Sequence, residues 1–374
     1  MSEQQTYEPG THPDLPPPSN TVGAVGWIRA NLLSSPLNIG LTALGLWLVY
    51  LTVPPIFAWA FTDAIWSGES SQACRNEDGG PVAAACWIYI GVWFKFLMYG
   101  RYPDTELWRI NTAYVILIAS MIPLFIPSFK YKGWLSIFLL FVYPVIAFYL
   151  FVGGSFNLMP VETPLWGGLF LTLVIAVTGI VASLPIGIVL ALGRRSDMPI
   201  VRAICIAFIE FWRGVPLITV LFMSSVMFPL FMPEGMNFDK LIRALVGVML
   251  FSAAYMAEVV RGGLQAIPKG QTEAAEALGL SYWKTMGLII MPQALKMVIP
   301  GIVNTFIGLF KDTTLVLIIG LFDFLGAAQS SFTNPDWAGF HTTAYVFVAF
   351  IFWVFCFGMS RYSMHLEKKL HTGH

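Results

Sequence analysis

The chain is poor in charged residues. Asp, Glu, Lys and Arg make up only 11% of its 374 residues, and the 21 basic residues balance the 21 acidic ones. Soluble globular domains carry about 25% charged residues, so this composition excludes an ordinary soluble protein. Because there is no basic excess, we also expect no nucleic-acid partner.

Residues that serve enzyme chemistry or metal binding are also few. The chain has five histidines, of which His341 and His365 are isolated, and they form no metal-binding pattern. No combination of nucleophile and base stands out. A G-x-x-x-x-G-K-[ST] phosphate loop is missing, since the nearest approach, Gly279 to Lys284-Thr285, lacks the second glycine. We therefore expect a chain that is not an enzyme and itself binds no metal or cofactor.

Long hydrophobic runs are abundant. Hydrophobic residues make up 57% of the chain, and a helix that crosses a membrane needs about 20 largely apolar residues. About eight such runs are present, at residues 38–60, 111–129, 134–152, 165–192, 203–232, 241–260, 294–320 and 341–361. The sequence therefore predicts an all-α polytopic membrane protein of about eight transmembrane helices.

A further apolar run at residues 86–99 is too short to cross a membrane and is interrupted by Lys95. We interpret it as an interfacial or re-entrant piece of an external loop. The alternative is a ninth span.

The chain divides near residue 160. Residues 1–37 begin with a polar, proline-rich stretch that does not resemble a cleaved signal peptide, and they predict a largely disordered tail. Residues 38–160 hold three spans and a long loop at 61–110, which we expect to be periplasmic. Residues 161–370 hold five spans and all the motifs described below.

A polar, alanine-rich stretch lies between the sixth and seventh spans. It runs from Glu273-Ala274-Ala275 through Gly279 to Ile289 and Pro292. Residues 271–278 are mostly good helix formers, and Gly279 suits a helix C-terminus. The alanines are small enough for the helix to enter a groove on a partner. We therefore expect a helical hairpin that a partner outside the bilayer grips.

The spacing E-A-A, three residues, G, nine residues, I-x-L-P resembles the signature of bacterial ATP-binding-cassette (ABC) importer permeases, with Met291 in place of the usual Leu. Other motifs resemble the polar amino-acid branch of this family. They are Ala257-Glu258-Val-Val-Arg261-Gly262-Gly263, Phe211-Trp212-Arg213-Gly214-Val215-Pro216, Lys311-Asp312-Thr313-Thr314-Leu315 and Arg361-Tyr362. The layout of the three-span N-terminal region is most like that of general L-amino-acid transporter permeases.

The resemblance implies an ABC type I importer permease core at residues 161–370, with cytoplasmic coupling helices at 262–292. It implies a partner ATPase that binds ATP and Mg and is contacted by Glu273, Ala274, Ala275, Gly279, Ile289 and Pro292. It also implies a second related permease, a periplasmic amino-acid-binding protein and an L-amino acid substrate, at the lipid of the bacterial inner membrane. A homodimer stays open as an alternative. The alternative function is an ion-driven secondary amino-acid transporter, which needs no ATPase.

The distribution of basic residues agrees with one orientation. If the hairpin lies in the cytoplasm, thirteen Lys and Arg residues fall on cytoplasmic segments and six on external ones, which are Arg75, Lys95, Arg101, Arg109, Lys240 and Arg243. Cytoplasmic loops carry an excess of Lys and Arg. Both termini are then predicted to be cytoplasmic.

Charged residues within spans mark candidate sites, because each costs roughly 2.5–3.5 kcal/mol on insertion scales. We hypothesise that Lys311, Asp312, Thr313 and Thr314 line the substrate pathway, and that Glu210 and Arg213 form a supporting or gating pair. The alternative is that both clusters are structural ion pairs. For Glu258 and Arg261, which are also three residues apart, we favour a structural role at the base of the hairpin over gate coupling.

Cys74 and Cys86 share the predicted periplasmic loop, so they can form a disulfide in that oxidising compartment. The sequence alone does not decide whether they do. Cys205 and Cys356 lie in spans, where we expect them to be packing residues.

Overall fold

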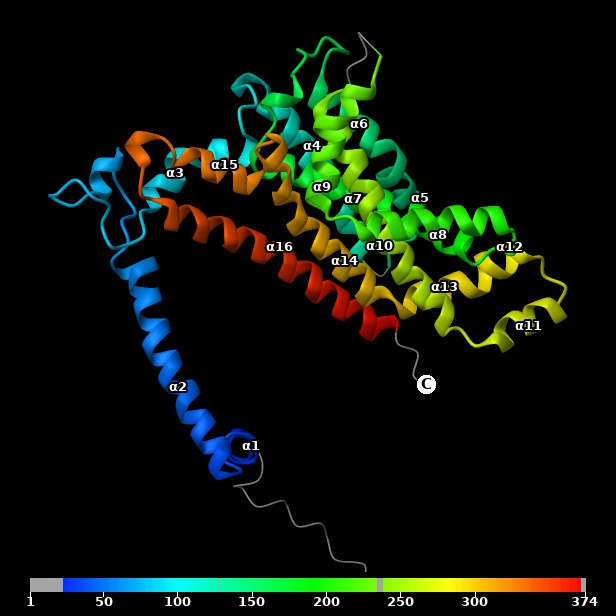
Figure 1. Ribbon diagram of the computed structural model, residues 1–374. Coiled ribbons are helices and arrows are strands. Elements are labelled where there is room, and N and C mark those ends of the chain that lie inside the picture. Colours follow the sequence, from blue (N-terminus) through cyan, green and yellow to red (C-terminus); the bar gives the residue numbers. More distant parts are fainter. Residues whose placement is uncertain (1–22, 127, 234–237, 371–374) are drawn as a thin grey trace, which may run out of the picture. The chain divides into compact units, whose positions relative to one another are not determined.

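The protein is helical throughout the part that the structure describes. The structure, a computed structural model, describes residues 23–126, 128–233 and 238–370 (Figure 1). Within these ranges the only β interactions are isolated bridges, such as the one between Gly168 and Asp323. The predicted all-α class is therefore confirmed.

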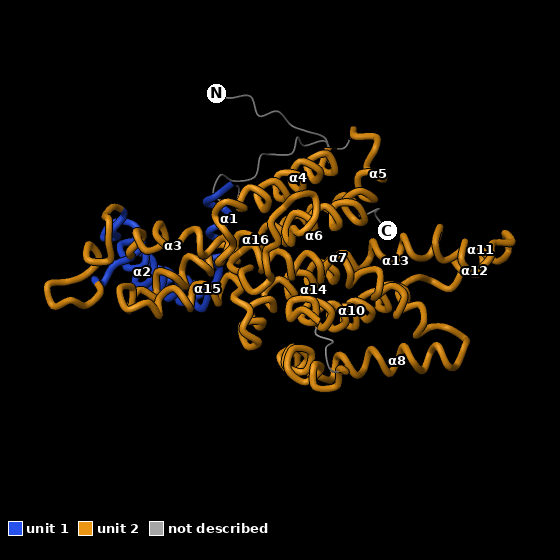
Figure 2. The backbone as a smooth tube through the Cα atoms, turned by 90° about the horizontal axis from the view of Figure 1, so that it is seen from above, with its two compact units in different colours: residues 1–66, 82–85 blue, residues 67–81, 86–374 orange. Residues whose placement is uncertain are grey.

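The chain separates into two compact units, which Figure 2 distinguishes by colour. The first comprises residues 1–66 and 82–85 and is described from Gly23. It contains α1 (Gly23–Asn31), α2 (Pro36–Phe57) and the π-helical turn η1 (Ala58–Thr62). Ser35 caps α2 by accepting a hydrogen bond from the Asn38 amide at 3.2 Å, and Pro36 occupies the first turn, where its missing N–H is not needed.

Helix α1 lies within residues 1–37, which the sequence predicts to be a largely disordered tail. In that range Gly23–Asn31 is helical. These nine residues contain no proline and several good helix formers, so the proline-rich composition that motivated the prediction ends before them. Residues 1–22 of the predicted tail lie outside the described residues.

The second unit comprises residues 67–81 and 86–374. Its N-terminal part holds two spans, Asp104–Phe125 and Lys132–Val152. The helical elements of this part are η2 (Ser71–Cys74), α3 (Trp87–Tyr99), η3 (Asp104–Glu106), α4 (Leu107–Phe125), α5 (Lys132–Ile137), η4 (Phe138–Val142) and α6 (Tyr143–Val152). Helix α3 has 13 residues, which is too short to cross a membrane, and it packs against α7, α15 and α16.

A disulfide joins Cys74 to Cys86, the pair that the sequence left open. Both cysteines are completely buried, and the Cys86 amide donates a hydrogen bond to Thr343 Oγ1 at 3.2 Å. The neighbouring Tyr89 hydroxyl bonds to Ser331 Oγ. The disulfide loop is therefore fixed to α15 and α16, in the C-terminal part of the chain.

Arg109 holds the N-terminal part of this unit against the segment that leads into the last five spans. Its side chain is completely buried, and its Nε donates to Glu106 Oε2 at 2.7 Å. Its Nη2 donates to the Met159 carbonyl oxygen at 2.8 Å. A buried cation is tolerated only when it is paired and hydrogen-bonded, and both conditions are met here.

The C-terminal part is built around α7 and α10, which pack along each other. Its elements are η5 (Thr163–Leu165), α7 (Gly168–Arg194), α8 (Pro199–Gly214), α9 (Leu217–Phe222), η6 (Met223–Met227), η7 (Phe228–Phe231), α10 (Lys240–Ala266), α14 (Ile299–Asp312), η9 (Thr313–Ile319), α15 (Phe324–Ser331), η10 (Pro335–Trp337) and α16 (His341–Leu370). Phe170, Leu171 and Ile175 of α7 are completely buried against Ala244 and Val248 of α10.

The predicted span at 203–232 is not one straight helix. It consists of Pro199–Gly214 and Leu217–Phe231, which meet at an angle of 101°. Pro216 lies at the break, where it can donate no backbone hydrogen bond and disfavours helix for the residue before it. The described residues thus contain seven helices able to cross a membrane, or eight spans if the bent pair counts as one.

Candidate functional site

Four short helices connect α10 to α14. They are α11 (Lys269–Ala277), α12 (Tyr282–Thr285), η8 (Met286–Ile290) and α13 (Met291–Met297). We call residues 268–297 the coupling segment; its first arm runs to Gly279 and its second arm follows that glycine. In Figure 1, α11 and α12 lie beyond the end of α10, away from the helices that surround α7. The hairpin expected from the sequence is therefore present, at one end of the second unit.

Gly279 ends the first arm of the coupling segment. Its φ is +72°, in the left-handed region that favours glycine. Its amide donates to the Glu276 carbonyl at 2.9 Å, and the Leu280 amide donates to the Ala275 carbonyl at 3.1 Å. This pair of bonds is the Schellman motif, which satisfies carbonyl groups at a helix C-terminus. The predicted glycine cap is therefore confirmed.

The second arm of the coupling segment is anchored in a buried cluster. Ile290 and Ala294 are buried together with Met256 and Val260 of α10. Gly263 allows this close packing, because a Cβ at that position would lie 2.6 Å from the Ala294 carbonyl oxygen. The second arm and α10 therefore pack directly against each other.

The first arm touches the second through Ala275 and Gln271. Ala275 is only 1% exposed, and α11 contacts η8. Ala275, which is predicted to contact the partner ATPase, is covered within the chain, because one face of α11 packs against the second arm. The Gln293 side chain donates to Gln271 Oε1 at 3.4 Å and also joins the two arms.

The outer face of the coupling segment exposes large apolar side chains. Leu278, Trp283 and Leu288 are each more than 70% exposed, and Tyr282 is 52% exposed. The other predicted coupling residues on this face are Glu273, Ala274, Gly279 and Pro292, all exposed, whereas Ile289 is half-buried. Sequence reasoning missed the apolar four, although aromatic residues within a polar connection between spans are a detectable signal of a binding surface.

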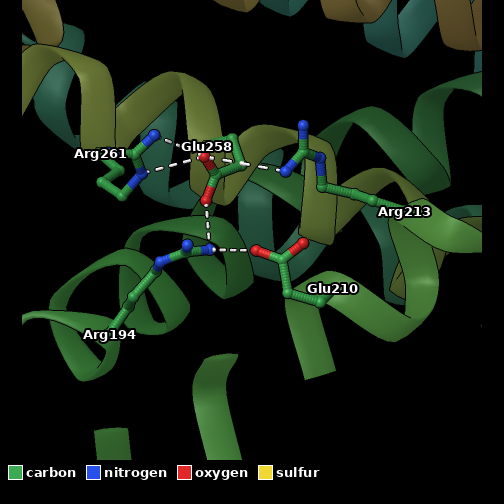
Figure 3. Close-up of polar contacts among 5 residues, drawn as sticks. All are labelled: Arg194, Glu210, Arg213, Glu258 and Arg261. Atoms are coloured by element: carbon green, nitrogen blue, oxygen red, sulfur yellow. Dashed lines mark hydrogen bonds and ion pairs between the residues drawn. The ribbon is translucent and has the colours of Figure 1, made fainter. Parts of the chain in front are cut away.

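At the same end of α10, five charged residues form a network, shown in Figure 3, that we call the Glu258 cluster. Its members are Arg194, Glu210, Arg213, Glu258 and Arg261. Glu258 lies at the centre and is only 16% exposed. Its Oε2 accepts from Arg261 Nη2 at 2.7 Å and Nε at 2.9 Å, and its Oε1 accepts from Arg194 Nη1 at 2.7 Å.

The structure corrects the expected pairing of Glu210 with Arg213. Glu210 Oε1 accepts from Arg194 Nη1 at 3.0 Å, whereas Arg213 Nη1 lies 3.8 Å from Glu258 Oε2. No ion pair between Glu210 and Arg213 is found in the described part of the chain. A spacing of three residues allows two side chains to meet, but here each finds a partner on another helix.

Arg194 is the member of the Glu258 cluster that sequence reasoning did not single out as a candidate. It is the last residue of α7, and its Nη1 contacts carboxylates of both α8 and α10. In the sequence it is one of many basic residues at span ends, which the orientation rule alone accounts for. Only tertiary packing distinguishes it from its neighbour Arg195, which donates to the Leu264 carbonyl at 3.0 Å.

The second candidate cluster lies where α14 changes into the 3-10 helix η9. Lys311 is exposed and Asp312 is half-buried, and within the described residues neither takes part in an ion pair. Thr313 Oγ1 donates to the Phe310 carbonyl at 2.8 Å, and Thr314 Oγ1 to the Lys311 carbonyl at 2.9 Å. A change of helix type within a span often marks a functional site. No hydrogen bond or ion pair in the described ranges joins this cluster to the Glu258 cluster.

Comparison with family models matches residues 183–372 to the binding-protein-dependent transport system inner membrane component family. The chain belongs to this family. The matched residues contain the bent helix pair, the Glu258 cluster, the coupling segment and Lys311. The resemblance inferred from the E-A-A motif is therefore confirmed.

Relatives of known name match nearly the whole chain of this family member. The inner membrane amino-acid ABC transporter permease protein YhdY of Escherichia coli (strain K12) is 55% identical over 97% of each chain. The glutamate/glutamine/aspartate/asparagine transport system permease protein BztC of Rhodobacter capsulatus is 42% identical over 96% of each. Both are named as permease proteins, so the prediction of a transport subunit rather than an enzyme is confirmed.

A solved structure described as an amino acid ABC transporter with histidines is also similar. It is 29% identical to this chain, and the match covers 54% of this chain and 92% of that one, with a TM-score of 0.48.

Proposed function

We propose that this chain is the membrane-spanning permease subunit of a bacterial ABC importer that moves L-amino acids across the inner membrane into the cytoplasm. The family match and the names of its long relatives support the class of transporter and of substrate. The single structural observation that carries the proposal is the coupling segment. It combines a firmly anchored second arm with an exposed apolar face, as a surface that receives force from a partner requires.

In the proposed mechanism the coupling segment sits in a cleft of a partner ATPase. The partner binds ATP and Mg, and closure of two ATPase subunits moves the segment. The buried contacts of Ile290 and Ala294 pass this movement to α10. The Glu258 cluster then passes it to α7 and α8, because Arg194 holds the ends of these helices to α10.

The remaining partners follow from the same proposal. A periplasmic amino-acid-binding protein delivers the substrate, and a second, related permease completes the transmembrane pathway as a heterodimer. The coupling segment and both termini lie in the cytoplasm, and the loop within residues 61–110 lies outside. Lys311, Asp312, Thr313 and Thr314 line the pathway. A zwitterionic substrate needs groups of both signs, and transporters supply them where a helix is interrupted, as α14 is here.

The proposal is tested by ATP-dependent amino-acid uptake into proteoliposomes that contain the whole complex. Gly279→Leu should abolish uptake, because a side chain at this position is strained at φ +72° and projects from the docking face. Gly358→Leu is the matched control, since Gly358 is helical and a Cβ there would meet no atom within 4 Å. The control should retain uptake.

The outcome also separates the proposal from its alternative. Uptake that a protonophore abolishes and that is indifferent to ATP would identify an ion-driven secondary transporter and refute the proposal. Retention of full ATP-driven uptake by Gly279→Leu would show that the coupling segment does not transmit work.

A further inference from the structure

Cations on the external side of the protein need an explanation, because Lys and Arg are concentrated in cytoplasmic segments. Of the six such residues named above, Lys95 is paired with Asp104 and Arg109 with Glu106. Arg75 donates to the carbonyl oxygens of Gly79 and Asp336. In the part of the chain that the structure describes, Arg101, Lys240 and Arg243 form no ion pair with a carboxylate.

Two of these three cations line one pocket. Lys240 and Arg243, on the first turn of α10, line a cavity of about 470 Å³ together with Thr163, Asp239 and Gly320. Arg101 lies beside the Gly320 segment, with its guanidinium 5.6 Å from the centre of the Phe322 ring. Two segments that are remote in the sequence thus bring positive charges to the segment that contains Gly320 and Phe322.

Asp239, the acid in the described lining of the pocket, offsets only one of the two cations, and its oxygens accept hydrogen bonds from other groups. Asp239 Oδ2 accepts from Thr163 Oγ1 at 2.5 Å. Asp239 Oδ1 accepts from the backbone amides of Leu241 at 2.8 Å and Ile242 at 3.2 Å, so that this carboxylate caps α10. The pocket therefore keeps an excess of positive charge.

The donors of the two cations remain available. The exposed Lys240 ammonium lies beside Gly320, and a Cβ on that glycine would be 3.8 Å from Nζ. Arg243 Nη1 donates to the Ser225 carbonyl at 2.6 Å, but its Nε is buried without a hydrogen-bond partner. Because a buried donor without a partner is unfavourable, an acceptor other than the described residues would stabilise this arrangement.

The position of the pocket indicates what that acceptor is. Lys240 begins α10, whereas the coupling segment follows its end, and a helix of 27 residues is about 40 Å long. If the coupling segment faces the ATPase, the pocket faces the side on which the binding protein releases its amino acid. A single amino acid fits within a few hundred cubic ångströms, and the one anionic group common to all of them is the α-carboxylate.

We propose that this pocket is an entry site that receives the α-carboxylate of the incoming amino acid, with Lys240 as the principal cation and the Arg243 guanidinium as a second positive charge. The inference rests on the proposed function. In this proposal the pocket recognises every amino acid by its carboxylate, whatever the side chain of the substrate.

The test is transport kinetics of the reconstituted complex with radiolabelled L-glutamine and varied concentrations of loaded binding protein. Lys240→Gln should lower the maximal uptake rate by roughly ten-fold, as expected for loss of a charge-assisted hydrogen bond, and leave the half-saturating concentration of binding protein unchanged. Lys240→Arg should restore most of the rate. Lys95→Gln is the matched control, because Lys95 is an external lysine with its own carboxylate partner.

A second measurement uses the purified complex without the binding protein. Binding of L-glutamine should depend on Lys240, whereas L-glutaminamide, which lacks the carboxylate, should not compete. This measurement distinguishes the entry-site proposal from the proposed function. If L-glutamine binding depends on Lys240 but the complex shows no ATP-driven uptake, the entry site would be supported and the proposed function rejected.

Three results would overturn the inference while leaving the proposed function intact. One is an unchanged maximal rate in Lys240→Gln. Another is a raised half-saturating concentration of binding protein at the same maximal rate, which would mean that Lys240 contacts an acidic surface of the binding protein. The last is equal competition by L-glutaminamide, which would show that the carboxylate is not recognised.

Discussion

Arg194 of α7 and Glu258 of α10 are joined by a charge-assisted hydrogen bond of 2.7 Å, although 64 residues separate them in the sequence. The same nitrogen of Arg194 lies 3.0 Å from Glu210 of α8. One guanidinium group therefore ties the ends of three helices together beside the coupling segment. If one of the three helices moves, the other two must therefore move with it, or a contact of Arg194 must break.

The first prediction concerns the centre of this network. Glu258→Gln should lower the free energy of unfolding by about 2 kcal/mol, because the hydrogen bonds to Arg194 and Arg261 lose their charge assistance. Thermal unfolding of the detergent-solubilised protein measures the change. Glu210→Gln is the control and should cost less than about 1 kcal/mol, since Glu210 is 55% exposed. Equal losses in the two variants would contradict a central role for Glu258.

The second prediction concerns Lys311. Lys311→Met should abolish amino-acid uptake but leave assembly and basal ATP hydrolysis intact, because the charge serves the substrate and not the fold. Removing a cation from a span also avoids an insertion cost of roughly 2.5–3.5 kcal/mol, so the variant should be at least as stable as the parent. Uptake, hydrolysis and subunit co-purification are measured on one preparation. Loss of assembly would instead assign Lys311 to a structural ion pair.

The third prediction concerns the disulfide. Cys74 and Cys86 are 12 residues apart, and closing a loop of this length stabilises a protein by about 3 kcal/mol in the chain-entropy description. The double variant Cys74→Ser/Cys86→Ser should lose about this much stability to thermal unfolding. Treatment of the parent with dithiothreitol should have the same effect. The control variant Cys356→Ser removes a free cysteine, so dithiothreitol should destabilise it as much as it destabilises the parent. An unchanged melting temperature in the double variant would refute the prediction.

The fourth prediction concerns Asp323, which is completely buried between η9 and α15. Its carboxyl group accepts from the amides of Leu325 at 3.2 Å and Gly326 at 3.0 Å. Burial disfavours the charged form and raises the pKa of Asp323 from 3.8 to about 6, although the two amides oppose this shift.

Because this pKa is higher in the folded than in the unfolded protein, the contribution of Asp323 to stability is complete below about pH 4. As pH rises through about 6 this contribution is lost, which lowers the free energy of unfolding by about 3 kcal/mol in total. Asp323→Asn keeps the cap but removes the titration, so its stability should vary less than that of the parent between pH 4 and 7. Parallel pH profiles of the two proteins in thermal unfolding would exclude this assignment.

Much of the fold could be predicted from local sequence patterns. The apolar runs predicted the spans to within a few residues at most ends, and the short run at 86–99 predicted a helix too short to cross a membrane. Gly279 indicated a helix cap at the position where the structure has one, and Pro216 lies where the helix breaks. These features depend on backbone geometry and on neighbours within a few residues, which the sequence displays directly.

The candidate site was less accessible to such reasoning. The motif located the coupling segment, but it did not reveal that Ala275 faces inward or that Trp283 and Leu288 face outward. The roles of the coupling residues and of Lys311 remain predictions. Arg194 could not be distinguished at all, because its carboxylate partners lie 16 and 64 residues away on other helices.

The amino-acid sequence by itself determined the membrane environment, the approximate limits of most membrane spans and the family signature between α10 and α14. All three are properties of composition and short-range spacing. Only the tertiary structure decided which arginine meets which carboxylate, which side of α11 is covered, and that Lys240 and Arg243 share a pocket with Gly320. Such contacts depend on how helices distant in the sequence pack together, and helical periodicity specifies a buried face without specifying its partner.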